Sequence, residues 1–265
     1  MDNFFLSLSI IHYPFSIMQN LYDNNWLYDL VHEKPADGEQ IAFYERQIER
    51  YGSPVLEIAC GTGNYLVTLS LNDVEISGLD NSDEMLQGAR RRAENQNTKT
   101  NLIKADMRNF ELNQKFALIF VAGNSFQHLN RLEDVEACFD SVKKHLAPNG
   151  KFIVEVFNPS LELLNRNRDE RYFVGEYKSG EGWIVLTENV FYDAATQINH
   201  LDWHYKNQFI KEEITVSFTM RQFFPQELDA LFRYNNFRIE QKFGDFDESD
   251  FTIDSPKQII VAGAI

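Results

Sequence analysis

The sequence predicts a doubly wound α/β fold, in which a mostly parallel seven-stranded sheet carries an antiparallel β insertion after its fifth strand. Between residues 40 and 157, short apolar runs alternate with segments of helical periodicity, the pattern of βα units around a parallel sheet. Over residues 172–222 the pattern changes to alternating, aromatic-rich runs, which indicate antiparallel strands.

The elements of the parallel part follow one another at short intervals. The strands are expected at residues 55–59, 74–79, 101–103, 116–121 and 151–156. The helices between them are expected at residues 40–51, 64–71, 83–95 and 131–146. The last helix is followed by Pro148-Asn149-Gly150, which predicts a helix stop and a turn before the next strand.

After the insertion, the pattern of the first part returns. A helix is expected from Pro225 to Tyr234, with proline in its first turn, and the apolar runs 238–243 and 258–262 complete the main sheet. We therefore expect an N-terminal lid segment at 1–39 and one domain at 40–265. The insertion at about 172–222 interrupts this domain and is expected to cover a substrate pocket.

Composition limits the partners and the compartment. The formal net charge of −15 disfavours a nucleic-acid partner, and Arg90-Arg91-Arg92 is interpreted as a solvated helix face. Two cysteines without metal-ligand spacing predict no metal site and favour the cytoplasm. No run reaches the roughly 20 apolar residues of a membrane span. Residues 1–17 lack a basic region and a cleavage site, so a signal peptide is not expected.

A glycine-containing loop follows the first expected strand. Small residues at Ala59, Gly61 and Gly63 allow a ligand to approach the backbone, and the next helix offers free N–H groups. Leu66 stands where a dinucleotide-binding loop would have its third glycine, and no phosphate-binding GxxxxGK[ST] is present. The carboxylate of Glu57 suits a cationic cofactor better than a pyrophosphate. These features favour S-adenosylmethionine.

The run LEIACGTG at residues 56–63 resembles motif I of class I methyltransferases, with alanine at the first glycine of that pattern. The resemblance implies a Rossmann-like fold, S-adenosylmethionine as cofactor and S-adenosylhomocysteine as product. It assigns Asp80 to the ribose hydroxyls, and Asp106 and Met107 to the adenine. The complete set of expected cofactor-binding residues is Tyr28, Glu57, Ala59, Cys60, Gly61, Gly63, Asp80, Asn81, Met85, Asp106, Met107 and Ala122.

Asp80 also has a purely structural interpretation, because aspartate is a common helix cap. Ser82 or Asn81 can fill that position before the helix at 83–95, which leaves Asp80 available to a ligand.

The run GNSFQHL at residues 123–129 resembles the GNSFxHL segment of glycine N-methyltransferases, in which the asparagine belongs to the acceptor pocket. We expect Asn124 and His128 to be catalytic, because a histidine with a pKa near 6.5 can accept the proton of an amine. A structural role is the alternative for His128, and a hydrophobic helix face for Tyr22 and Tyr28. The expected substrate contacts are Tyr22, Tyr28, Asn124, His128, Asn158 and Arg221.

The predicted function is transfer of a methyl group to a small molecule, with an amine nitrogen as the acceptor atom. The alternatives are O-methylation, a nucleotide-dependent dehydrogenase, and a non-catalytic protein that binds the cofactor. A protein or RNA methyltransferase is disfavoured by the acidity of the chain and by the absence of an NPPY-like tetrapeptide after the fourth strand. The acceptor, the oligomeric state and the nature of residues 1–17 stay open.

Overall fold

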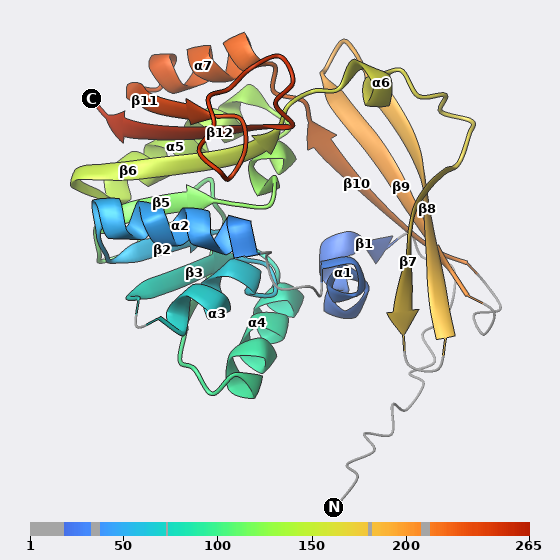
Figure 1. Ribbon diagram of the computed structural model, residues 1–265, viewed down its shortest axis with the longest axis horizontal. Coiled ribbons are helices and arrows are strands. Elements are labelled where there is room, and N and C mark those ends of the chain that lie inside the picture. Colours follow the sequence, from blue (N-terminus) through green and yellow to red (C-terminus); the bar gives the residue numbers. More distant parts are fainter. Residues whose placement is uncertain (1–18, 33–37, 73, 180–181, 208–212) are drawn as a thin grey trace, which may run out of the picture.

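The structure, a computed structural model, describes residues 19–32, 38–72, 74–179, 182–207 and 213–265. Its larger sheet has seven strands in the order β11-β12-β6-β5-β2-β3-β4 (Figure 1). Strands β4, β3, β2, β5 and β6 pair in parallel, and β12 is antiparallel to β6 and β11. The strands are β2 (Val55–Ile58), β3 (Ile76–Asp80), β4 (Asn101–Lys104), β5 (Phe116–Val121), β6 (Leu146–Phe157), β11 (Phe237–Phe243) and β12 (Lys257–Ala264). The predicted mostly parallel, seven-stranded sheet is confirmed.

Helices cover both faces of this sheet, as the alternation of strands and helices predicts. They are α2 (Gly38–Tyr51), α3 (Asn64–Ser70), α4 (Asp83–Asn95), α5 (Leu132–His145) and α7 (Pro225–Tyr234), with the short α6 (Leu161–Leu164) after β6. Leu56 and Ile58 of β2 pack in the same cluster as Phe139 of α5. Val55 points to the other face and packs with Phe43 of α2. The strands are therefore buried on both sides, which fixes their register and the edge at which they end.

The expected turn at Pro148-Asn149-Gly150 is wrong in part. Helix α5 ends at His145 as predicted, but β6 begins at once at Leu146, and the three residues lie inside it. The pairing of β5 with β6 shifts between Phe116 and Leu118, and Asn149 has a φ of 66°. A Cβ at Gly150 would lie 2.9 Å from the carbonyl oxygen of Phe116. The segment is thus a bulge that needs glycine, not a separate turn.

The insertion forms the second sheet, in the order β1-β10-β9-β8-β7. Its strands are β7 (Tyr172–Ser179), β8 (Gly182–Asp193), β9 (Ile198–Lys206) and β10 (Ile214–Arg221), and each pairs antiparallel with the next along the chain. The predicted antiparallel insertion after the fifth strand is confirmed. The short strand β1 (Gln19–Asn20), which pairs in parallel with β10, was not predicted.

The described part of the expected lid segment lies between the two sheets (Figure 1). It continues from β1 into the 3-10 turn η1 (Leu21–Asp23) and helix α1 (Asn25–His32). Leu21, Leu27 and Leu30 are buried in one cluster with residues of β8, β9 and β10. Residues 1–18 and 33–37 of this expected segment lie outside the described residues.

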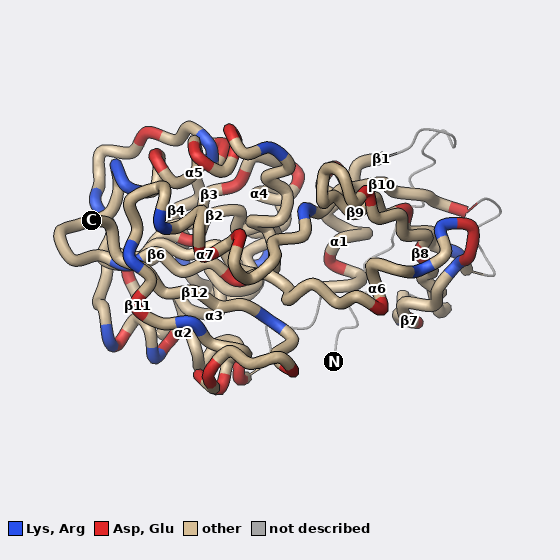
Figure 2. Tube along the Cα trace, turned by 90° about the horizontal axis from the view of Figure 1, so that it is seen from above, with Lys and Arg blue, Asp and Glu red and all other residues tan. Residues whose placement is uncertain are grey.

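The arginine triplet on α4 is not simply a solvated face. Arg91 Nη2 donates to Asn25 Oδ1 over 2.8 Å, and Arg92 donates to the carbonyl oxygen of Thr62 and pairs with Asp29. These contacts tie α1 to the main sheet. Elsewhere, Figure 2 shows lysines and arginines spread along the trace among acidic residues. Within the described residues, no helix is long and apolar enough to span a membrane.

Candidate functional site

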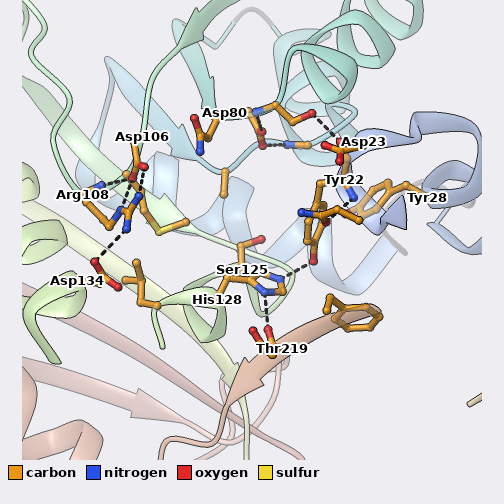
Figure 3. A pocket seen from close by; sticks show the side chains of 18 of the residues that line it. Tyr22, Asp23, Tyr28, Asp80, Asp106, Arg108, Ser125, His128, Asp134 and Thr219 are labelled. Carbon is orange, nitrogen blue, oxygen red and sulfur yellow. Dashed lines mark hydrogen bonds and ion pairs between the residues drawn. The ribbon is translucent and has the colours of Figure 1, made fainter. Parts of the chain in front are cut away.

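One cavity of about 880 Å³ lies at the carboxyl ends of the parallel strands and extends to the insertion sheet. Open α/β folds bind ligands at this edge of the sheet. The cavity brings together part of the predicted site, namely Tyr22, Tyr28, Ala59, Gly61, Asp80, Asn81, Asp106, Met107 and His128. Figure 3 shows Asp80, Asp106, His128 and Tyr22 around this one space.

The glycine loop forms one wall of the cavity. Ala59, Gly61 and Gly63 all have positive φ, at 56°, 54° and 81°. Ala59 therefore adopts a left-handed conformation that costs a residue with a Cβ about 1–2 kcal/mol. Gly61 lies under Tyr28, whose hydroxyl oxygen would be 3.5 Å from a Cβ there. Backbone, rather than side chain, is what this loop presents to a ligand.

Asp80 ends β3 and faces the loop. Its Oδ2 accepts a hydrogen bond from the Gly61 N–H and its Oδ1 accepts one from the Ser82 N–H, both over 2.8 Å. Burial raises the pKa of Asp80, and the N–H groups that donate to it oppose that rise. The cap of α4 is Ser82, whose Oγ accepts from the Met85 N–H. Asp80 is therefore not needed as a helix cap, which removes its structural alternative.

Glu57 lies behind the loop, outside the cavity lining. It is 2% exposed, and its Oε2 has no hydrogen-bond partner among the described residues. Burial raises the pKa of Glu57 well above its usual range. A cationic or N–H group that reached this oxygen would satisfy it, because an unpaired buried carboxylate oxygen is costly. The expected contact with a cofactor ammonium stays a prediction.

Asp106 lies on the opposite side of the cavity from Tyr22 (Figure 3). Arg108 holds it through Nη2 to Oδ2 at 2.6 Å and through Nε to Oδ1 at 3.0 Å. The same guanidinium binds Asp134 over 3.0 Å. Arg108 lowers the pKa of Asp106, so this carboxylate is ionised over a wide pH range. Arg108 and Asp134 were not predicted as site residues. Arg108 follows Asp106 by two positions, which is an ordinary spacing in a loop, and Asp134 lies 26 positions further along the chain.

His128 and Tyr22 form the centre of the cavity. The His128 Nδ1 lies 2.9 Å from the carbonyl oxygen of Thr219, which can only accept, so Nδ1 carries the proton. Burial lowers the pKa of His128, and the neutral ring then has its lone pair on Nε2. The Tyr22 hydroxyl lies 2.5 Å from that nitrogen and donates to it. Burial raises the pKa of Tyr22 well above its usual range, so the phenol is protonated at neutral pH.

Tyr28 reaches the same cavity from α1. Its ring stacks on His32 at 4.2 Å between ring centres, and its own carbonyl oxygen lies 2.9 Å from the His32 Nδ1. Burial raises its pKa. The interpretation of Tyr22 and Tyr28 as a mere hydrophobic face does not describe their positions, since both line the cavity.

The structure does not bring the other predicted residues to the cavity. Arg221 is 6% exposed and pairs with Glu227 of α7 over 2.6 Å, at the end of β10 and beyond the residues that line the cavity. Asn158 donates to the carbonyl oxygen of Ser255 and fastens the loop before β12. Asn124 is buried at the start of η2 (Ser125–His128), with a φ of 63°. Cys60, Gly63, Met85 and Ala122 lie outside the lining and support the loop and the strands around it.

The lining also holds residues that the sequence did not single out. They are Asn20, Asp23, Leu79, Ser82, Ala105, Arg108, Ser125, Leu129, Asp134, His200, Leu201, Asp202, Ser217, Phe218 and Thr219. Those from β9 and β10 come from the insertion, which the sequence predicted as a cover. Their alternation with apolar neighbours indicates a strand, but it does not determine which face of the strand borders the cavity.

Comparison with known proteins identifies the central part of the chain. Residues 55–150 match the family model described as a methyltransferase domain. The CcbJ methyltransferase from Streptomyces caelestis superimposes on 92% of this chain and 98% of its own with a TM-score of 0.77, at 20% identity. The fold of the main sheet and its insertion is thus shared by the two proteins over almost the whole chain.

Two curated relatives resemble about half of this chain in sequence. A dTDP-3-amino-3,4,6-trideoxy-alpha-D-glucopyranose N,N-dimethyltransferase from Streptomyces venezuelae is 31% identical over 138 residues, 50% of this chain and 56% of that protein. A dTDP-3-amino-3,6-dideoxy-alpha-D-glucopyranose N,N-dimethyltransferase from Streptomyces fradiae is 34% identical over 134 residues, 49% of this chain and 51% of that protein. The matched segment spans about half the length of these relatives.

Proposed function

We propose that this protein transfers the methyl group of S-adenosylmethionine to the nitrogen of a small-molecule amine. One observation carries the proposal. The glycine loop with Asp80 and the Tyr22–His128 pair line the same cavity, so a nucleoside site and a proton-accepting site lie side by side. The sequence relatives named above are N,N-dimethyltransferases of amino sugars, which supports nitrogen as the acceptor atom.

The donor groups around the cavity fit S-adenosylmethionine. Asp80 offers carboxylate oxygens to the ribose hydroxyls, and Asp106 with the backbone of Met107 lies where the adenine is expected. The backbone of the loop at Gly61 leaves room for the amino-acid part, and the orphaned Glu57 Oε2 lies behind it. When bound, the cofactor supplies an electrophilic methyl group on a sulfonium.

Tyr22 and His128 can accept the proton that the acceptor amine loses. Transfer forms a nitrogen–carbon bond from the nitrogen lone pair, breaks the sulfur–carbon bond and leaves S-adenosylhomocysteine and one proton. The Tyr22 hydroxyl donates to His128 Nε2, so its oxygen lone pairs are available to an N–H of the acceptor. The proton then moves to Tyr22 as the phenol proton passes to His128, which Thr219 holds in orientation.

The same pair favours nitrogen over oxygen. A neutral amine is already nucleophilic, whereas an alcohol must lose much of its proton to attack. The lowered pKa of His128 makes it a weak base. Such a base can take the proton from a methylated amine, but it is poor at removing the proton of an alcohol before attack.

Two measurements test the proposal. Calorimetric titration with S-adenosylhomocysteine should show binding, and labelled methyl transfer should be detected with a panel of amino sugars and small amines. Tyr22→Phe should lower kcat by about 100-fold, the lower end of general-base effects, with the affinity for S-adenosylhomocysteine unchanged within threefold. Tyr234→Phe, at an exposed tyrosine of α7, is the matched control. No binding of S-adenosylhomocysteine refutes the cofactor, and normal kcat in Tyr22→Phe refutes the proton role.

We also propose the cytoplasm as the compartment and small molecules, not nucleic acids, as partners. Cys60 and Cys138 are both buried, free thiols, and thiols persist in a reducing compartment. The net charge of −15 disfavours polyphosphate partners. Fractionation of the producing cells checks the compartment.

A further inference from the structure

The charge around the cavity narrows the acceptor. The described residues that line it include five aspartates, Asp23, Asp80, Asp106, Asp134 and Asp202, but one arginine, Arg108. That arginine already pairs with two of the five carboxylates. Asp80 and Asp106 belong to the side where the nucleoside is expected, and Asp134 pairs with Arg108 beside Asp106. This leaves Asp23 and Asp202 for the acceptor.

Asp202 lies in a polar row across the insertion sheet. The pairing of β1, β10 and β9 places Asn20, Ser217 and Asp202 opposite one another, and the Ser217 hydroxyl donates to Asp202 Oδ1 over 2.5 Å. Thr219 and His200 form the next row on the same face. Hydroxyl, amide and carboxylate groups in such rows can both donate to and accept from the hydroxyls of a ligand.

A nucleoside diphosphate does not suit this wall. A diphosphate brings negative charge, and tight recognition of phosphate in proteins relies on Arg, Lys or helix N-termini. Among the described lining residues, Arg108 is engaged by Asp106 and Asp134, and His200 is cationic only when protonated. The overall charge of −15 adds to the repulsion.

We propose that the acceptor is a hydroxylated amine without phosphate, such as a free or glycosidic amino sugar or an aminocyclitol, and that Asp202 binds it. This inference rests on the proposed function, because it assigns a substrate class to the same cavity. It separates this protein from relatives whose names specify dTDP-linked amino sugars. The volume of about 880 Å³ is near the top of the range of about 300–1,000 Å³ for ligand pockets, which leaves room for an acceptor beside the nucleoside.

A matched pair of probes tests the assignment in the full-length protein saturated with S-adenosylhomocysteine. The probes are the methyl glycoside of 3-amino-3,6-dideoxyglucose and its dTDP-linked form, which differ only in the group on the anomeric carbon. Calorimetry should show the glycoside binding at least tenfold more tightly. Added salt should weaken glycoside binding and strengthen that of the dTDP-linked sugar, because screening reduces both attraction and repulsion.

Variants of Asp202 locate the effect. Asp202→Asn should weaken glycoside binding about three- to tenfold, the loss of one charge-assisted hydrogen bond at an exposed site, and Asp202→Lys should strengthen binding of the dTDP-linked sugar. Asp254→Asn, an exposed residue outside the cavity, removes the same charge and should change nothing. The assignment is overturned if the glycoside does not bind, if the dTDP-linked sugar binds as tightly, or if Asp202→Asn matches Asp254→Asn. Loss of S-adenosylhomocysteine binding in the native protein would instead count against the proposed function.

Discussion

Replacing Asp80 by asparagine gives the sharpest test of the cofactor site. The carboxylate accepts hydrogen bonds from the Gly61 and Ser82 N–H groups through different oxygens. An amide keeps the shape but has one acceptor oxygen, so one of these buried N–H groups would face an NH₂ group. The substitution also removes a charged acceptor for the ribose hydroxyls.

The expected loss of S-adenosylhomocysteine affinity follows from these hydrogen bonds. A hydrogen bond to a charged group contributes about 1.5–3 kcal/mol, so losing one such bond to the ribose costs about 2 kcal/mol. This corresponds to about 30-fold weaker binding of S-adenosylhomocysteine. The change in unfolding free energy should be smaller, because removal of a buried charge offsets part of the lost hydrogen bond.

Isothermal calorimetry with S-adenosylhomocysteine measures the affinity directly. Asp83→Asn is the matched control, since that neighbouring carboxylate is 73% exposed and pairs with Lys104 outside the cavity. An Asp80→Asn protein that binds within threefold of the native protein would refute the assignment of Asp80 to the ribose. Equal weakening by both variants would show a general effect of charge instead.

Three further predictions follow from the geometry. Asp106→Asn should weaken S-adenosylhomocysteine binding about tenfold, less than Asp80→Asn, because Arg108 already shares this carboxylate; calorimetry decides, and unchanged affinity refutes its role. Gly78→Ala should lower the unfolding free energy by about 1–3 kcal/mol in urea titrations, since its Cβ would lie 2.5 Å from Leu66 Cδ2, whereas Gly38→Ala has open space and should not. Because the pKa of His128 is lower in the folded than in the unfolded protein, the unfolded chain is protonated at a higher pH as the pH falls. Stability should therefore fall as the pH drops below about 6.5, and less so in His128→Gln; an equal fall in both proteins refutes this.

The fold was predictable because its signals are local. Each strand of the main sheet is a short apolar run, and each helix between them has its own periodicity and end signals, as at Pro225 of α7. The bulge at Pro148-Asn149-Gly150 was not predictable, because the same three residues favour a free turn. The parallel pairing of β1 with β10 depends on a contact between residues about 200 positions apart. No local pattern records such a contact.

The position of Asp80 and Asp106 at one edge of the sheet was predictable for a related reason. Asp80 and Asp106 follow successive strands, and the topology of a parallel sheet carries such residues to one edge. Arg221 was assigned by its alternation with apolar neighbours, and Asn158 by its place directly after a strand. The structure pairs the first with Glu227 and the second with the loop at Ser255. Arg221 shares a face of β10 with Ser217 and Thr219, which line the cavity, so its ion pair with Glu227 at the end of the strand, and not the face, keeps it from the site. The sequence pattern does not record that ion pair.

The arrangement of the expected acceptor side was harder to predict than that of Asp80 and Asp106, because it is formed by three segments far apart in the sequence. Tyr22 comes from the segment before α1, His128 from the turn after β5, and Thr219 from the insertion. The Tyr22–His128 bond forms only if α1 is held between the sheets, which the contacts of Arg91 and Arg92 with Asn25 and Asp29 help to ensure. A bond of this kind orders residues 106 positions apart, and its entropic cost must be met by the buried leucines of α1 and η1. The packing of α1 is therefore a condition for the proposed proton relay, and loosening it should lower kcat even when Tyr22, His128 and Thr219 are intact.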